Sequence, residues 1–388
     1  MANRFLPYGR QSIDDSDIAA VVEVLRGDWL TTGPTIEALE EAFAEAVGAD
    51  HAVACSNGTT ALHLALAAEG VGPGDVCIVP AITFMATANA ALSCGAEVVF
   101  ADVDPDTGLM TPASLEEAIG RADGHARVAL PVHLAGQCEA IDEMAQLVSA
   151  AGAVLVEDAC HAVGSRWKDE PVGNGRHARA ATFSFHPVKT IAAGEGGMVT
   201  TRDAALARRM RLLRSHGIER DTARHERSES EPWWHEMQAL GWNYRLSDIQ
   251  AALALSQLRR LDAFTARRRE LAQAYDAALS RANLPVAPLQ RTPDCDPCLH
   301  LYPVRIDFEA IGRSRGEIMA ALAGQGIGSQ VHYIPVPDQP FYTARYGRQD
   351  LPGARRYYAR TLSLPLFVGM TDEDPGRVID ALAAALGT

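Results

Sequence analysis

Residues 182–201 read TFSFHPVKTIAAGEGGMVTT, two short apolar runs separated by a glycine-containing segment. The runs TFSF and GMVTT predict two strands, and Pro187 ends the first because proline has no backbone N–H. The segment between them carries Lys189. The chain has 35 lysines and arginines in total, and only two of them, Lys168 and Lys189, are lysines. A desolvated lysine can lose its proton and attack a carbonyl, whereas arginine cannot, so the stretch predicts a strand end with a candidate nucleophile.

The chain before this stretch alternates strand-like and helix-like segments from about residue 51. The expected strands are the apolar runs HAVACS, DVCIVPA, EVVFADV, ARVALPVHL and AVLVEDA. Strands that alternate with helices of this length predict an α/β fold with a mostly parallel central sheet covered by helices on both faces. Ligands of such sheets bind beyond the carboxyl ends of the strands, so the polar residues that follow each run are the candidates for function.

The remainder of the chain predicts a second, smaller domain. A helix (DAALARRMRLLRSHG) and a charged loop at 218–236 precede a segment at 246–279 with helical spacing, which we interpret as one long helix capped by Ser247. Shorter strands and helices follow. We expect a large domain at 1–265 and a smaller α+β domain at 266–388.

Composition narrows the class of protein. The net charge of −14 disfavours a partner that is a nucleic acid or an anionic membrane, because both are held by surplus lysine and arginine. We find no signal peptide and no long apolar stretch, and expect a cytoplasmic location. The seven cysteines suit reduced thiols. CDPC at 295–298 has the spacing of one cysteine pair of a zinc site, but the sequence offers no second pair. We therefore interpret CDPC as a loop and expect no metal.

Two further segments offer chemistry. In SNGTTALHLAL at 56–66, Thr59 and Thr60 open a helix whose first amides can hold a phosphate, although such residues are more often plain helix caps. In VLVEDACHAVGS, Asp158 ends an apolar strand, where it serves either as a salt-bridge partner or helix cap, or as the acid that pairs with the ring nitrogen of a pyridine cofactor. With Lys189, a phosphate site and a ring-nitrogen acid together indicate pyridoxal 5′-phosphate (PLP).

The chain resembles the DegT-type sugar aminotransferases, which are PLP enzymes of fold type I, over nearly its full length. The resemblance lies in LPYGRQSID, WLTTGP, SNGTTALHLAL, EDACHAVGS, SFHPVKTIAAGEGG, GWNYRLSDIQAALALSQL and VHYIPV. It implies that Lys189 forms the imine with the cofactor and carries the proton, and that Asp158 pairs with the ring nitrogen. The other implied cofactor ligands are Thr59, Thr60, Ser184 and, from the second subunit of a homodimer, Asn243 at the phosphate, with Phe84 and His161 at the ring.

The same resemblance implies a reaction. Within the family the likeness is strongest to the transaminases of pseudaminic acid biosynthesis. They transfer nitrogen from L-glutamate, leaving 2-oxoglutarate and pyridoxamine phosphate (PMP), to UDP-2-acetamido-2,6-dideoxy-β-L-arabino-hex-4-ulose in a ping-pong sequence. Implied substrate residues are Trp29, Arg245, His332 and Tyr333. A structural salt bridge for Arg245, and a half-buried strand face for the last two, are the alternatives.

Other functions remain open from the sequence. One is amination of a different nucleotide keto sugar, of the perosamine, bacillosamine or aminoarabinose type. Another is a PLP-binding regulator that senses a sugar. Related sugar dehydratases replace the imine lysine, so the presence of Lys189 disfavours that activity.

Overall fold

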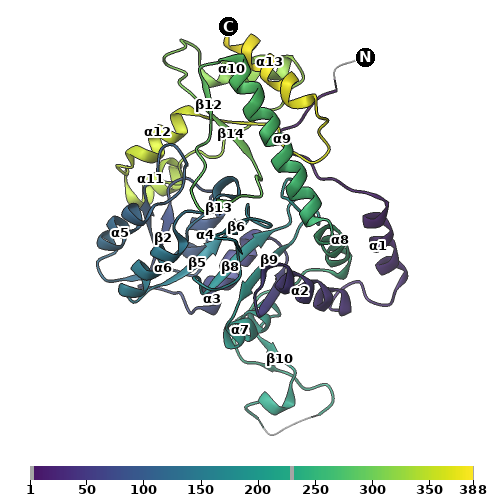
Figure 1. Ribbon diagram of the computed structural model, residues 1–388. Coiled ribbons are helices and arrows are strands. Elements are labelled where there is room, and N and C mark those ends of the chain that lie inside the picture. The colour runs from purple at the N-terminus through teal and green to yellow at the C-terminus, as the bar shows by residue number, and fades with distance from the viewer. Residues whose placement is uncertain (1–3, 228–230, 388) are drawn as a thin grey trace.

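A seven-stranded sheet forms the centre of the computed structural model, which describes residues 4–227 and 231–387 (Figure 1). The strand order is β1-β9-β8-β5-β4-β2-β3, and only the pairings of β9 within this sheet are antiparallel. The predicted mostly parallel sheet is therefore confirmed. Its strands are β1 His51–Cys55, β2 Val76–Pro80, β3 Glu97–Ala101, β4 Ala126–Ala129, β5 Val154–Asp158, β8 Ala180–Ser184 and β9 Gly197–Thr201.

Helices cover both faces of this sheet because successive strand residues point to opposite sides. Val53 and Cys55 of β1 belong to one apolar cluster with α3, α4 and α7, whereas Ala52 and Ala54 belong to another with α2, α5, α6 and α8. These helices are α2 Pro34–Val47, α3 Gly58–Ala68, α4 Ala86–Ser93, α5 Pro112–Arg121, α6 Ile141–Ala150, α7 Ala204–Arg214 and α8 Asp248–Leu258.

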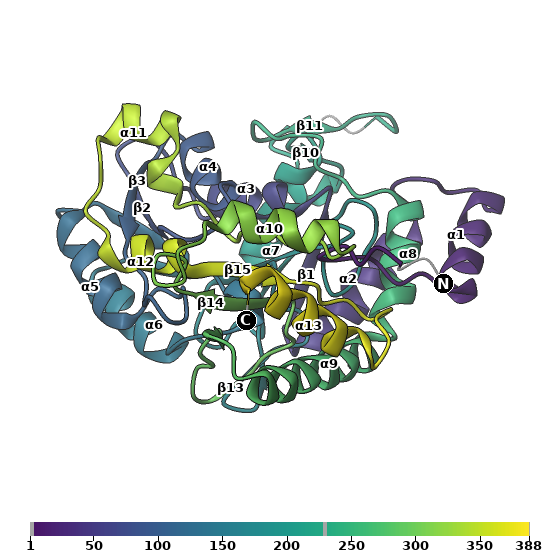
Figure 2. The ribbon, with the colours of Figure 1, turned by 90° about the horizontal axis from the view of Figure 1, so that it is seen from above.

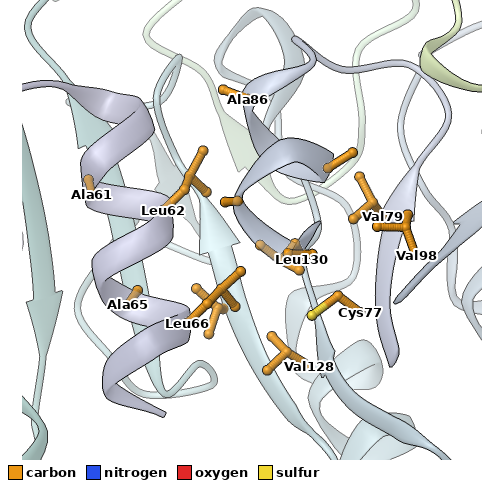
Figure 3. Packing of buried hydrophobic residues seen from close by; sticks show 14 of the residues in the cluster. Ala61, Leu62, Ala65, Leu66, Cys77, Val79, Ala86, Val98, Val128 and Leu130 are labelled. Atoms are coloured by element: carbon orange, nitrogen blue, oxygen red, sulfur yellow. The ribbon is translucent and has the colours of Figure 1, made fainter. Parts of the chain in front are cut away.

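Buried leucines of α3 pack in the same apolar cluster as residues of the sheet. Figure 3 shows Leu62 and Leu66 on the side of α3 that faces the other labelled residues, among them Cys77 and Val79 of β2 and Val128 of β4. All five are fully or almost fully buried. This packing fixes the N-terminus of α3 beside the carboxyl ends of the neighbouring strands.

A three-stranded antiparallel sheet with its own apolar cluster forms the second region, at the top of Figure 1. The cluster joins this sheet to α9, α10 and α13, and also includes Leu6 near the N-terminus. Its elements are α9 Leu261–Ala282, β12 Val286–Pro288, β14 Tyr302–Ile306, α10 Arg315–Gly324, β15 Thr361–Leu364 and α13 Asp374–Leu386. Because α9 contributes Phe264 to the large cluster and Leu271 to the small one, we propose a domain boundary at residue 265.

The single long helix predicted at 246–279 is wrong, because the structure has two helices there, α8 and α9. Ser247 caps α8 as expected, but the chain changes direction at Arg260. The Arg260 guanidinium forms ion pairs with Asp14 and Asp17 beside α1, Asp15–Arg26. The turn allows α8 to pack against α1 and α2 while α9 packs against α13.

The predicted charged loop forms a projecting arm, clearest at the lower end of Figure 1, of which residues 228–230 lie outside the described residues. It contains β10 Ile218–Glu219, the 3-10 helix η2 Thr222–Arg224 and β11 Glu236–Met237. The segment CDPC, expected to be a loop, begins as β13 Cys295–Asp296, which pairs with β6 Arg166–Trp167, itself paired with β7 Glu170–Pro171.

Shorter elements complete the chain, and Figure 2 shows α11 at the far end of the molecule from α1. They are η1 Leu134–Gly136, η3 Val336–Asp338, α11 Pro340–Tyr346 and α12 Pro352–Arg360. Over the described residues, no helix is both long enough and apolar enough to cross a membrane.

Candidate active site

A cavity of about 600 Å³ lies where the carboxyl ends of the parallel strands meet the second region. Its wall includes residues that end β5 and β8, residues that follow β1 and β2, and the segment 330–334 of the second region. Eight of the predicted site residues line it: Thr59, Phe84, Asp158, His161, Ser184, Lys189, His332 and Tyr333. Ligand binding beyond the strand ends is the usual arrangement in sheets of this kind.

Lys189 is the principal cation of the cavity wall. It follows β8 in an irregular segment held by hydrogen bonds from the Lys189 N–H to the His186 carbonyl and from the Ala193 N–H to the Phe185 carbonyl. Its side chain is half-buried, and Nζ forms neither a hydrogen bond nor an ion pair with any described residue. Burial lowers the pKa of Lys189, against an opposing effect of the nearby Cys160 and Asp158. An amine with these properties is suited to nucleophilic attack on an aldehyde.

Asp158 is buried at the end of β5, with 5% of its surface exposed. One carboxylate oxygen accepts a hydrogen bond from the Thr87 hydroxyl at 2.7 Å and the other from the Cys160 N–H at 3.2 Å. In residues 4–227 and 231–387 no lysine or arginine pairs with it, so the salt-bridge alternative is not realised within the described chain. A buried carboxylate is costly without a cationic partner, and a protonated ring nitrogen would supply that partner.

The N-terminus of α3 offers an anion site. Asn57 caps the helix by accepting from the Thr60 N–H, which leaves the preceding amides of Gly58 and Thr59 without intrahelical acceptors. A Cβ atom added to Gly58 would lie 2.8 Å from the Ser184 Cβ and 3.2 Å from the Cys160 Sγ. Only glycine therefore fits beside Ser184. Free amides, a helix dipole and two hydroxyls together make a suitable phosphate cradle.

Three imidazoles, those of His161, His300 and His332, lie near Lys189. Burial lowers the pKa of His161 and His300 well below the usual value, and lowers that of His332 to about 3. The Tyr333 hydroxyl lies 3.2 Å from His161 Nε2, and His332 Nδ1 lies 2.8 Å from the Ser363 hydroxyl. These rings are uncharged at neutral pH, so they provide polar contacts without competing with a cationic ligand ring.

Four predicted site residues lie outside the cavity of the single chain. The Thr60 hydroxyl is used within the helix cap, where it bonds to Asn57 and Ser56. Asn243 is exposed on a segment bridged to Ser215. Trp29, 58% exposed, lies on a loop whose Thr31 bridges Ser247.

Arg245 is the fourth of these residues. It is half-buried and forms no ion pair within the part of the chain that the structure describes. The structural salt bridge considered for it from the sequence is therefore absent there.

The structure adds residues that the sequence did not indicate. Tyr8 and His300 line the cavity from distant parts of the chain. Gly58 lies at the end of the cavity that suits a phosphate, and Thr87 of α4 donates a hydrogen bond to Asp158. Gly58 and Thr87 follow apolar strands, so their positions were a usable signal. Tyr8 and His300 reach the cavity only through tertiary packing.

Comparison with known proteins decides the family. Residues 11–383 match the DegT/DnrJ/EryC1/StrS aminotransferase family. The chain belongs to this family. It is 39% identical over 383 residues to the spore coat polysaccharide biosynthesis protein SpsC of Bacillus subtilis, covering 98% of this chain and 97% of SpsC.

Solved structures of aminotransferases agree with this chain over nearly the full length of both chains. PseC of Helicobacter pylori, an aminotransferase involved in pseudoaminic acid biosynthesis, is 29% identical with a TM-score of 0.90, covering 99% of this chain and 100% of PseC. The PLP form of Spr1654 from Streptococcus pneumoniae is also 29% identical with a TM-score of 0.89, covering 99% of each chain.

The DegT family and these structures establish the class of enzyme. The chain has the type I fold of PLP enzymes and is a PLP-dependent sugar aminotransferase. PLP and PMP forms are both known for Spr1654. The cavity fits this cofactor in three ways, with Lys189 available for the aldehyde, Asp158 lacking a described cationic partner, and the α3 N-terminus open beside Gly58.

Proposed function

We propose that the chain transfers an amino group from L-glutamate to the 4-keto carbon of a nucleotide-linked 6-deoxy sugar by a ping-pong mechanism. The preferred substrate is UDP-2-acetamido-2,6-dideoxy-β-L-arabino-hex-4-ulose. The observation that carries the proposal is that Lys189, half-buried and without an ion-pair partner among the described residues, lies in the same cavity as the buried Asp158. A cavity of about 600 Å³ is within the size range of small-molecule sites.

Each cavity residue has a proposed task. Lys189 binds the cofactor aldehyde and, once released by the donor, moves a proton between the substrate carbon and the cofactor. Asp158 pairs with the protonated ring nitrogen, with the Thr87 hydroxyl orienting the carboxylate. The amides of α3 with Thr59 and Ser184 hold the phosphate. When bound, PLP supplies an electron sink, so that a proton can leave the carbon next to the transferred nitrogen.

The cavity wall of the second region serves the substrates in this proposal. His332 and Tyr333 line the same cavity as Lys189 and, because burial keeps the imidazole uncharged, present hydrogen-bonding groups to a sugar. Phe84, half-exposed at the same cavity, stacks on the cofactor ring. His161 contacts the ring from its position beside Lys189.

A homodimer with shared active sites accounts for the residues outside the cavity. Trp29 and Asn243 are exposed, Arg245 forms no ion pair within the described chain, and several large apolar side chains are exposed as well. The exposed set includes Leu25, Leu30, Trp233, Met237 and Leu240. In a dimer, Asn243 would reach the partner's phosphate, and Trp29 and Arg245 the donor or sugar. A cytoplasmic location stays a prediction from the sequence.

The experiment is an activity assay with the purified protein, PLP and L-glutamate. A panel of nucleotide-linked keto sugars is offered, and mass spectrometry detects the gain of an amino group in the sugar together with 2-oxoglutarate. We expect amination of the UDP-linked 4-keto-6-deoxy sugar, its loss in Lys189→Ala and its retention in Lys168→Ala. Lys168 is the matched control because it is the only other lysine, pairs with Asp142 and is not among the residues that line the cavity. Exchange between simple amino and keto acids without amination of any sugar would contradict the proposal.

The second candidate is another keto sugar. The chain is 39% identical to SpsC, a protein of spore coat polysaccharide biosynthesis, and 29% identical to PseC. Faster turnover of a perosamine, bacillosamine or aminoarabinose precursor in the same panel would favour this candidate. PLP binding with no amination of any substrate would favour a sugar-sensing regulator.

A further inference from the structure

The CDPC segment brings a thiol pair together outside the cofactor cavity. Cys295 lies on β13, and Cys138 follows η1, 157 residues earlier in the chain. The Cys138 N–H donates a hydrogen bond to the Cys295 sulfur over 3.3 Å. The Cys138 thiol also donates to the Cys295 sulfur. The backbone and the thiol of Cys138 therefore both lie against the Cys295 sulfur.

Hydrogen bonds hold the backbone on both sides of this pair. The Thr292 hydroxyl donates to the Cys138 carbonyl over 2.6 Å, and the Thr292 N–H donates to the Gln137 side-chain carbonyl over 3.1 Å. On the other side, Cys295 pairs with Trp167 in the sheet β13-β6-β7. All seven cysteines are free thiols, so Cys138 and Cys295 are not covalently bonded. The hydrogen bonds and the strand pairing hold their segments side by side.

The surroundings of Cys295 differ from those of the other half-buried thiols, Cys94 and Cys160. Hydrogen bonds from the Cys138 thiol and N–H, with help from His133, lower the pKa of Cys295 to about 7. Burial raises the pKa of Cys94 to about 12 and that of Cys160 well above the usual value. Because thiolates are the reactive form, Cys295 combines partial exposure with reactivity in a way that the other two do not.

We propose that Cys295 is a site of oxidation by hydroperoxides and that Cys138 is its resolving thiol. The Cys295 thiolate attacks the terminal peroxide oxygen, the O–O bond breaks, and one protonated alcohol or water leaves, giving a sulfenic acid. The Cys138 sulfur then attacks the Cys295 sulfur, and the S–OH bond breaks with release of water. The two thiols lose two electrons and the peroxide gains them, so the product is the Cys138–Cys295 disulfide.

This disulfide would join two segments that both approach the cofactor cavity. Cys138 follows η1, where the Ala135 N–H donates to His161 Nδ1 over 3.4 Å. Cys295 precedes Cys298, whose thiol donates to the His161 carbonyl over 3.0 Å. The bond would fix the positions of both segments relative to each other, on the side of the cavity where His161 lies.

The test uses the full-length protein treated with a small excess of hydrogen peroxide at neutral pH. Remaining thiols are then alkylated, and peptides are mapped without reduction. We expect one linked pair that contains Cys138 and Cys295, reversed by dithiothreitol, with Cys94 and Cys160 still alkylated. In Cys138→Ser, dimedone should label Cys295, and in Cys295→Ser the linked pair should vanish. Cys94→Ser is the matched control and should behave as the parent chain.

Other outcomes overturn the proposal. Oxidation of Cys94 or Cys160 as fast as Cys295 would contradict it, and so would a Cys295–Cys298 disulfide in place of the predicted pair. Absence of any dimedone label on Cys295 in Cys138→Ser would do the same. Because thiolate content sets the rate, we expect the alkylation of Cys295 to be at least about tenfold faster than that of Cys94. This comparison needs no peroxide and remains informative if one variant fails to fold.

Discussion

Gly58→Ala places one methyl group between α3 and β8, at the end of the cavity assigned to the cofactor phosphate. The new Cβ would lie 2.8 Å from the Ser184 Cβ, 3.1 Å from the Ser184 hydroxyl and 3.2 Å from the Cys160 Sγ. The closest atom is the Cβ of a strand residue rather than the tip of a flexible side chain. Overpacking of this kind costs ~1–3 kcal/mol, so α3 or Ser184 must move.

The movement separates Ser184 from the α3 amides that share the phosphate. Loss of one hydrogen bond to a charged group costs ~1.5–3 kcal/mol, which corresponds to roughly 10–150-fold weaker binding. We therefore expect the Kd of PLP to rise by that factor in Gly58→Ala. The assay is a titration of apoprotein with PLP, followed by the absorbance of the lysine–cofactor imine.

Gly316→Ala is the matched control for this prediction. Gly316 also lies in the first turn of a helix, α10, but an added Cβ would meet only the Ser314 hydroxyl at 4.0 Å. It should leave the Kd unchanged and corrects for the helix preference of alanine. An unchanged Kd for Gly58→Ala would refute the phosphate assignment, provided that circular dichroism shows a folded protein.

Three further predictions concern the cavity and the second region. Thr87→Val removes the 2.7 Å hydrogen bond to Asp158, so kcat should fall by roughly 10-fold or more in steady-state kinetics. Thr87→Ser keeps the hydroxyl and should keep kcat close to that of the parent chain. Burial lowers the pKa of Lys189, so its free amine is present at lower pH than that of an exposed lysine. In a stopped-flow pH series, the rate of imine formation by apoprotein should therefore reach its plateau well below pH 10.5. A rate that still rises up to that pH would contradict the assignment. Arg268 is buried and donates hydrogen bonds to the Leu299, His300 and Leu366 carbonyls. Arg268→Ala should therefore lower the free energy of unfolding by ~3 kcal/mol or more in a denaturant titration, and a loss below about 1 kcal/mol would contradict this stabilising role.

The sheet could be predicted from the sequence because its strands are short, buried and separated by helices. Six of the seven strands of the central sheet fall within the expected apolar runs, and β8 begins two residues before its run. Ser247 caps a helix as its side chain predicts. The site followed from the same pattern, since Asp158 and Ser184 end strands and Lys189 follows one. Position in a parallel sheet is local information, and the sequence contains it.

Other features depend on contacts between distant residues and were missed for that reason. The break before α9 is set by Arg260 and its ion pair with Asp17, 243 residues away in the sequence. Tyr8 reaches the cavity because Leu6 bridges Ile327 in the second region. Neither a periodic pattern nor a short motif reports such pairings.

The central claim is that Lys189 is the residue bound to PLP, and a single labelling experiment tests it most directly. Purified protein with its cofactor is reduced with borohydride, digested, and mapped by mass spectrometry. The account predicts the cofactor mass on the peptide that contains Lys189, an unlabelled Lys168 peptide, and no label in Lys189→Ala. Label on the Lys168 peptide, or an undiminished label in Lys189→Ala, would contradict it.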